Sequence, residues 1–173
     1  LSKNPQYPDF SANTLQGGDC TNFVSQALHT GGWQYTASRD DKSTNTWYVA
    51  WNNAKRAFTN SQTWSTAAGF YRRIINDKYE KSVLPTSDLY SLRPGDIAFL
   101  TSGGKSHHTM IVTGYQEKPW WNPFASYGPL VSYHNGGVNP NTNMPNLPQQ
   151  NILLTEVIAL SPNDTPVFAK VRS

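Results

Sequence analysis

The sequence predicts an α+β fold in which N-terminal helices pack on an antiparallel β-sheet. Apolar residues first recur at helical spacing, within residues 20–29, 46–58 and 67–75. After residue 92 the period changes, and short runs rich in β-branched residues alternate with turn residues. Helices that precede a run of strands, instead of alternating with them, are typical of the α+β class.

The composition indicates one globular domain spanning residues 1–173, which we expect to be monomeric. Charged residues make up 14% of the chain and aromatic residues 13%, which differs from the composition of disordered proteins. No apolar run approaches the ~20 residues of a membrane span. The formal net charge is +3 without a cluster of Lys and Arg, so we expect no nucleic-acid partner. A single cysteine excludes an intrachain disulfide framework.

The first helix is expected from Cys20 to His29. Gly17-Gly18 allows a turn before it, Asp19 is of a type favoured at the N-cap, and Gly31-Gly32 ends it. The only cysteine would therefore lie in the first helical turn, where unpaired N–H groups and the helix dipole favour a thiolate. Free cysteine is also among the most buried residue types. Position alone thus leaves open both a nucleophile and a small core residue.

The other elements follow from the same patterns. Helices are expected at 46–58, with the tryptophans of that segment in the core, and around Ala67–Ile75. Strands are expected at 97–100, 107–115, 130–134, 152–160 and 167–171, with a hairpin turn at 102–104 and loops at 87–91 and 135–150.

Three histidines fall at the ends of neighbouring predicted strands. His107 and His108 open one strand, and His134 closes the next. If these strands pair antiparallel, His108 and the His134-Asn135 step become neighbours. Because side chains alternate along a strand, only one of His107 and His108 can face the helix. A Cys–His–polar triad with Cys20 would then assemble, in which a base takes the thiol proton and a third group orients the base.

Several motifs resemble one known family. The block from Gly17 to Gln26 is similar to the signature of the putative amidase domain family of bacterial secreted proteins. That family is a papain-like branch related to NlpC-type and cysteine/histidine-dependent amidohydrolase/peptidase cell-wall hydrolases. The stretches Asn4–Tyr7, Leu92–Ile97 and His108–Gly114 also resemble its motifs, in the same order. Members of that family usually carry a helix before the Asn-Pro-x-Tyr stretch, so we expect that this helix has been cleaved away or lies outside residues 1–173.

The resemblance implies the roles of the triad residues. Cys20 corresponds to the nucleophile and His108 to the general base, which the spacing before the strand favours over His107. The third position corresponds to His134 or to Asn135, and we favour His134. On this reading, loss of Cys20 or His108 would abolish turnover, whereas loss of His134 would reduce it.

The resemblance also suggests residues that surround the triad. Tyr7 is similar in placement to a tyrosine that lines NlpC-type sites, and the Cys20 backbone N–H is a candidate oxyanion donor. Asp19 is expected to cap the helix, while Trp120 and Trp121 are candidates for substrate contact. The implied protein is a secreted or wall-associated, cofactor-free amide hydrolase with a papain-like fold, acting on peptidoglycan or another peptide.

Two alternatives use the same residues differently. Cys20, His108 and His134 could be three zinc ligands that leave an open position for water. No short His-x-His or Cys-x-x-Cys pair supports this alternative. The chain could instead be a wall- or glycan-binding module that uses Trp120, Trp121 and the Asn-rich loop without catalysis.

Overall fold

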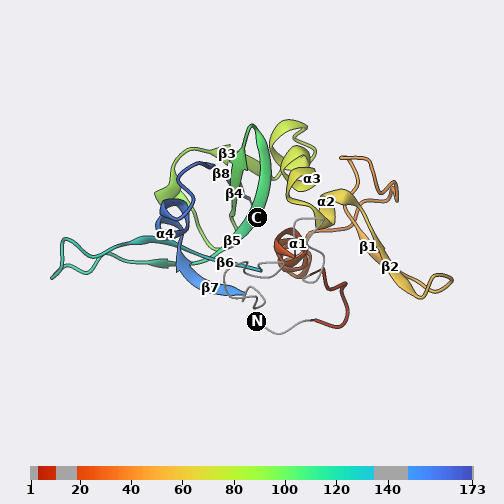
Figure 1. The fold of residues 1–173 in the computed structure, drawn as a ribbon, viewed down its shortest axis with the longest axis horizontal. Coiled ribbons are helices and arrows are strands. Elements are labelled where there is room, and N and C mark those ends of the chain that lie inside the picture. The colour runs from red at the N-terminus through yellow and green to blue at the C-terminus, as the bar shows by residue number, and fades with distance from the viewer. Residues whose placement is uncertain (1–3, 11–18, 135–147, 173) are drawn as a thin grey trace.

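The structure is a computed structural model that describes residues 4–10, 19–134 and 148–172. Its centre is a six-stranded antiparallel sheet with the strand order β3-β8-β4-β5-β6-β7 (Figure 1). The strands are β3 (Val83–Thr86), β4 (Ile97–Ser102), β5 (Lys105–Gln116), β6 (Gly128–Tyr133), β7 (Gln149–Leu153) and β8 (Thr165–Val171). The predicted α+β class is confirmed.

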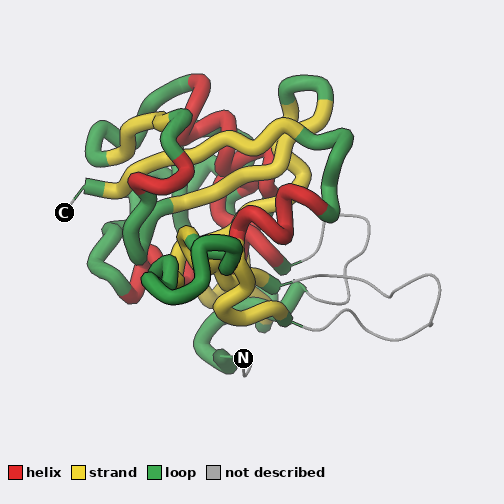
Figure 2. The backbone as a smooth tube through the Cα atoms, turned by 90° about the vertical axis from the view of Figure 1, so that its left-hand side faces the viewer, coloured by secondary structure: helices red, strands yellow, loops and turns green. Residues whose placement is uncertain are grey.

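Helices cover both faces of this sheet. One face carries α1 (Cys20–Thr30), α2 (Gln62–Ser65) and α3 (Ala67–Tyr71), which continues into the π-helical turn η2 (Arg72–Asn76). The other face carries α4 (Leu154–Ala159), and a 3-10 turn, η3 (Leu89–Ser91), precedes β4. In Figure 1 the α1–α3 group and α4 lie on opposite sides of the central strands, which run side by side in Figure 2.

Alternation along the strands divides the core into two clusters. Phe99 and Ile111 face the α1–α3 group and pack with Val24 and Leu28 of α1, among others. Their strand neighbours Ala98, Leu100, Met110 and Val112 face the opposite way and pack with Leu154 and Val157 of α4. The face on which a residue of β4 or β5 lies therefore determines which helices it can contact.

Two buried tryptophans fill the space between α1 and α2. The rings of Trp47 and Trp64 lie 4.8 Å apart, and both side chains are fully buried. Trp64 Nε1 donates to Asn22 Oδ1 at 2.8 Å, and Trp47 Nε1 donates to Ser25 Oγ at 3.2 Å. Burial of an indole is favourable when its N–H finds an acceptor, so these bonds place polar α1 side chains inside the core.

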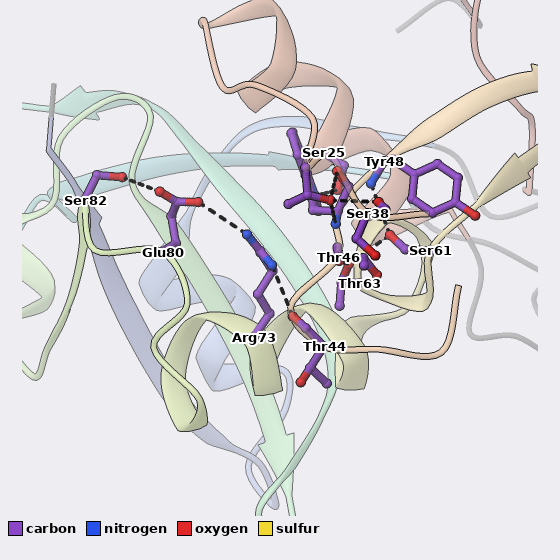
Figure 3. A network of polar contacts seen from close by, with 12 residues as sticks. Ser25, Ser38, Thr44, Thr46, Tyr48, Ser61, Thr63, Arg73, Glu80 and Ser82 are labelled. Carbon is purple, nitrogen blue, oxygen red and sulfur yellow. Dashed lines mark hydrogen bonds and ion pairs between the residues drawn. The ribbon is translucent and has the colours of Figure 1, made fainter. Parts of the chain in front are cut away.

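A network of hydroxyl groups ties the segment before β1 to the helices (Figure 3). Thr63 Oγ1 donates to Thr46 O, and Ser61 Oγ pairs with Thr63 Oγ1 at 2.9 Å. The guanidinium of Arg73 donates to Thr44 O at 3.1 Å. Because buried polar groups are stable only when they are hydrogen-bonded, this network fixes the path of the chain into the core.

The helix expected over 46–58 is wrong. This segment forms a two-stranded antiparallel hairpin, β1 (Val49–Asn52) and β2 (Ala57–Asn60). Trp47 is a core residue as expected, whereas Trp51, also expected in the core, is 53% exposed on β1. The backbone bonds of Trp47 show why no helix forms. Its N–H and C=O both pair with Thr36, so neither serves a helical turn. Tertiary hydrogen bonds here override an apolar spacing that also fits a helix.

The strand expected over 152–160 is also wrong beyond its start. The chain leaves β7 at Leu153, and α4 begins at Leu154. Leu154 and Val157 are one helical turn apart and both are buried in the α4 cluster. β3 was not expected from the sequence, and it contains Pro85. Proline is tolerated in this position since β3 pairs only with β8, at the edge of the sheet. The other expected helices and strands are confirmed, with small changes at their ends.

Replacing Gly69 with alanine is expected to destabilise the fold by about 1–3 kcal/mol. Helix propensity alone would predict a gain of about 1 kcal/mol. A Cβ on Gly69, however, would lie 2.7 Å from the backbone oxygen of Gln62 and 2.7 Å from Thr66 Oγ1. Urea unfolding measures the difference, with Ala68→Gly as a control for propensity at the adjacent position. A more stable Gly69→Ala protein would contradict the close packing of α2 against α3.

Candidate functional site

Cys20 opens α1 at the point where this helix meets the sheet. Its side chain is only 2% exposed. Its Sγ lies 3.7 Å from Thr21 Oγ1, and that hydroxyl lies 3.0 Å from Thr109 Oγ1 on β5. The β5 side chain that meets the first turn of α1 is therefore that of Thr109.

The environment of Cys20 raises the pKa of its thiol. Burial is the largest cause, hydrogen bonding with Thr21 and Thr109 acts in the opposite direction, and the charge of Asp19 adds to the increase. The sequence left open a nucleophile and a small core residue at this position, and the unpaired N–H groups and helix dipole favoured the thiolate. Burial acts against the charged form. A neutral thiol at this position needs a base before it can act as a nucleophile.

His134 supplies an imidazole over the first turn of α1. Its Nδ1 lies 2.7 Å from Asp19 Oδ2, and its ring stacks on Phe23 at 4.3 Å with an interplanar angle of 18°. Phe23 lies four residues after Asp19 and three after Cys20, so it shares a helix face with each of them. Nε2 of His134 is buried and has no hydrogen-bond partner among the described residues. The ring therefore lies over the first turn of α1, which begins at Cys20.

The Asp19 carboxylate orients this histidine and does not cap the helix. Its side chain makes no capping bond to α1. Oδ1 instead accepts from Asn22 Nδ2 at 2.7 Å and from the backbone N–H of Phe10 at 3.2 Å. The capping role expected from the sequence is wrong, because the carboxylate turns toward His134. A carboxylate on one imidazole nitrogen fixes the tautomer and leaves the other nitrogen as a base.

Asn22 is a site residue that the sequence reasoning missed. Its amide donates to Asp19 Oδ1 and to Pro8 O, and its carbonyl oxygen accepts from Trp64. It is fully buried. A buried amide with every group bonded holds the Asp19 carboxylate rigidly. The available signal was an asparagine inside the apolar first turn of a helix, where this residue type is not favoured.

His108 lies on the opposite face of the sheet from α1. It pairs with Leu100 across the ladder, and its ring meets the Tyr133 ring edge-on at 4.7 Å, next to Val157 of α4. The expectation that His108 faces the helix is therefore not met. β5 turns Thr109 toward α1, so alternation turns its neighbour His108 away. The register shift between Leu100 and Thr101 leaves His107 outside the ladder, where its Nε2 pairs with Asp164 at 2.9 Å.

Burial lowers the pKa of His108 to about 4 from an ordinary value of 6.5, with a smaller contribution from the nearby His107. Between these two pH values the unfolded chain binds a proton that the folded protein does not. The free energy of unfolding is therefore expected to fall as the pH drops from 6.5 toward 4. Urea unfolding at several pH values tests this, and His108→Gln should show a shallower fall. An identical pH dependence in both proteins would contradict the assignment.

The remaining predicted site residues lie in the aromatic core, on an exposed loop or outside the described residues. Tyr7 stacks on Trp64 at 5.8 Å and meets His29 edge-on, so it belongs to the aromatic core. Trp120 and Trp121 are exposed on the loop between β5 and β6. Asn135 lies outside the described residues. Of the predicted residues, the structure thus brings Asp19 and His134 into contact at the start of α1, where Cys20 is the first helical residue.

The zinc alternative requires Cys20, His108 and His134 to converge. Their positions do not meet this requirement, because His108 faces α4 while the other two lie on the α1 side. Within 4–10, 19–134 and 148–172, no group of three or more His, Cys, Asp or Glu side chains is arranged to hold a metal ion. The three residues therefore do not fit a common zinc site.

Comparison with known proteins identifies the family. In the part of the chain that the structure describes, no helix is long and apolar enough to cross a membrane. Searches of curated proteins and of solved structures found no match. The sequence matches the family model of the putative amidase domain over residues 1–146, which is most of the chain and includes Cys20, Asp19 and His134. The chain therefore belongs to the putative amidase domain family.

Proposed function

We propose that this protein is a cysteine-dependent amide hydrolase in which Cys20 is the nucleophile and His134, oriented by Asp19, is the base. Membership of an amidase family supports amide hydrolysis. The observation that carries the proposal is the 2.7 Å bond between His134 Nδ1 and Asp19 Oδ2 beside the only cysteine. A carboxylate, an imidazole and a thiol in this order are the parts that acyl transfer needs.

The chemistry begins when the thiol turns from Thr21 toward the histidine. Nε2 of His134 takes the Sγ proton, and the thiolate attacks the carbonyl carbon of the substrate. The C–N bond then breaks, the imidazolium returns its proton to the leaving amine, and a thioester to Cys20 remains. Water, deprotonated by the same nitrogen, hydrolyses the thioester and restores the thiol. Asp19 stabilises the imidazolium that forms in both half-reactions.

The substrate class that we propose is the peptide part of bacterial peptidoglycan. The resemblance of the Gly17–Gln26 block to cell-wall hydrolases motivates this choice. A formal net charge of +3 also favours adsorption to an anionic wall polymer. The same chemistry would cut a muramoyl–peptide amide, a bond within the stem peptide or a crossbridge.

Digestion of purified peptidoglycan tests the proposal and identifies the bond. Mass spectrometry of the soluble products should show new amine and carboxylate ends, with the mass gain of one water for each cut. Alkylation of Cys20 should stop product release, while a chelator should leave it unchanged. Inhibition by the chelator but not by alkylation would refute the thiol mechanism. Cleavage of peptides with intact walls left uncut would refute the substrate assignment alone.

A further inference from the structure

The hairpin between β5 and β6 ends in an exposed aromatic tip. Trp120, Trp121 and Phe124 are 94%, 69% and 94% exposed. Figure 1 shows the hairpin projecting from the body on the side away from α1. Single exposed apolar side chains are ordinary on a protein surface, but three large rings within five residues form a patch that indicates an interaction site.

The turn that carries these rings is held in one conformation. The backbone N–H of Asn122 donates to Pro119 O at 3.2 Å, and the N–H of Ala125 donates to Asn122 O at 3.2 Å. Asn122 Oδ1 also accepts from the N–H of Phe124 at 3.0 Å. Pro119 and Pro123 restrict the backbone further. The turn therefore presents the rings outward instead of folding them onto the body.

The tip offers few hydrogen-bonding groups for the size of its aromatic surface. Between Pro119 and Ala125 the only side-chain acceptor is the oxygen of Asn122, which is already bonded within the turn, and the side-chain donors are its NH₂ and the N–H groups of Trp120 and Trp121. A saccharide, which carries many hydroxyl groups, would leave most of them unpaired against such a surface. Contact with an apolar medium does not carry this cost, because such a medium has no hydroxyl groups to leave unpaired.

Behind the tip, tyrosines lie beside basic side chains, and we call Tyr90, Tyr115 and Tyr127 the tyrosine collar. The Tyr127 ring stacks on Tyr90 at 5.2 Å, and the Lys118 ammonium lies 5.4 Å from the centre of the Tyr127 ring. Tyr90, Arg93 and Tyr115, with Glu117, line an adjoining cavity of about 430 Å³. Membrane interfaces favour this order: apolar rings at the greatest depth, amphipathic rings at the headgroups, and long cationic side chains reaching the phosphates.

We propose that this tip inserts into the interfacial region of a lipid bilayer, with the tyrosine collar and Lys118 at the headgroup level. The projection of the hairpin from the body supports a broad, deformable surface as the partner, because the exposed rings can enter such a surface without obstruction by the rest of the protein. β6 leads from the hairpin at Gly128 to the end next to His134, which is about 20 Å along the strand. Insertion would hold the Cys20 site above the bilayer. The proposal does not depend on the hydrolytic function.

Binding of the full chain to lipid vesicles tests the insertion. Co-sedimentation with phosphatidylcholine vesicles containing phosphatidylglycerol should show partition of the wild-type protein, with a blue shift of tryptophan emission. The triple variant Trp120→Ser, Trp121→Ser, Phe124→Ser should partition at least about tenfold more weakly. Leu160→Ser removes a similarly exposed apolar side chain elsewhere on the surface and should bind like wild type.

Brominated lipids give a second readout on the unaltered protein, because bromine near the interface quenches an inserted indole. Quenching of wild-type fluorescence is expected, and its absence would refute insertion even if the triple variant failed to fold. Equal partition of the triple variant and the wild type would also refute the proposal. Loss of peptidoglycan binding in the triple variant, without any vesicle binding by wild type, would assign the tip to a saccharide instead.

Discussion

Replacing Cys20 with alanine is expected to lower kcat/KM for amide hydrolysis by at least about 10³-fold. The proposed mechanism forms a covalent bond to Sγ, and this chain has no second cysteine that could substitute for it. The side chain is small and buried, so its loss should cost the fold only about 1 kcal/mol. Steady-state hydrolysis of a defined peptidoglycan fragment, measured beside thermal unfolding, separates the loss of chemistry from a loss of fold.

Cys20→Ser provides the matched control, because it keeps the volume of the side chain and a proton that His134 could accept. A serine variant should be folded and should turn over far more slowly than wild type. Mass spectrometry should also detect the acyl-enzyme on wild-type Cys20 when hydrolysis is quenched early. If Cys20→Ala retained a tenth or more of wild-type activity, the thiol mechanism would have to be abandoned.

Replacing His134 with alanine is expected to lower kcat/KM by about 10²–10⁴-fold, the usual contribution of a general base. His108→Ala is the discriminating comparison. His108 packs against Tyr133 on the α4 side of the sheet, so its loss should reduce stability while leaving the rate of the folded protein within a few-fold of wild type. If His108→Ala instead lost more activity than His134→Ala, the general base would be His108, as the family resemblance implies.

Asp19→Asn tests the positioning role of the carboxylate. The amide keeps the size of the side chain but removes the charge that faces His134 Nδ1. We expect kcat to fall by about 10²-fold or more, with little change in KM, because Asp19 acts on the base and not on the substrate. A change confined to KM, or to thermal stability, would indicate that the Asp19–His134 pair is only structural.

The helices and strands whose residues follow one clear pattern could be predicted from the sequence. The apolar stripe after Cys20 and the glycines that follow it predicted α1, and the β-branched run after His108 predicted β5. The segment 46–58 was mistaken for a helix because its apolar spacing also fits a hairpin. Pairing of the Trp47 backbone with Thr36 decided between them, and no local pattern reveals such a bond.

The sequence by itself determined the candidate residues for the proposed chemistry: one cysteine at a helix start and histidines at strand ends. It also determined the family, since the motif blocks lie within a single matched domain. Only the tertiary structure decided which histidine lies on the α1 side. Successive side chains of a strand point to opposite faces of the sheet. Because Thr109 contacts α1, its neighbour His108 lies on the other face. The position of His134 over Asp19 follows from the pairing of β5 with β6 and the seating of α1 on that face, which are both long-range contacts.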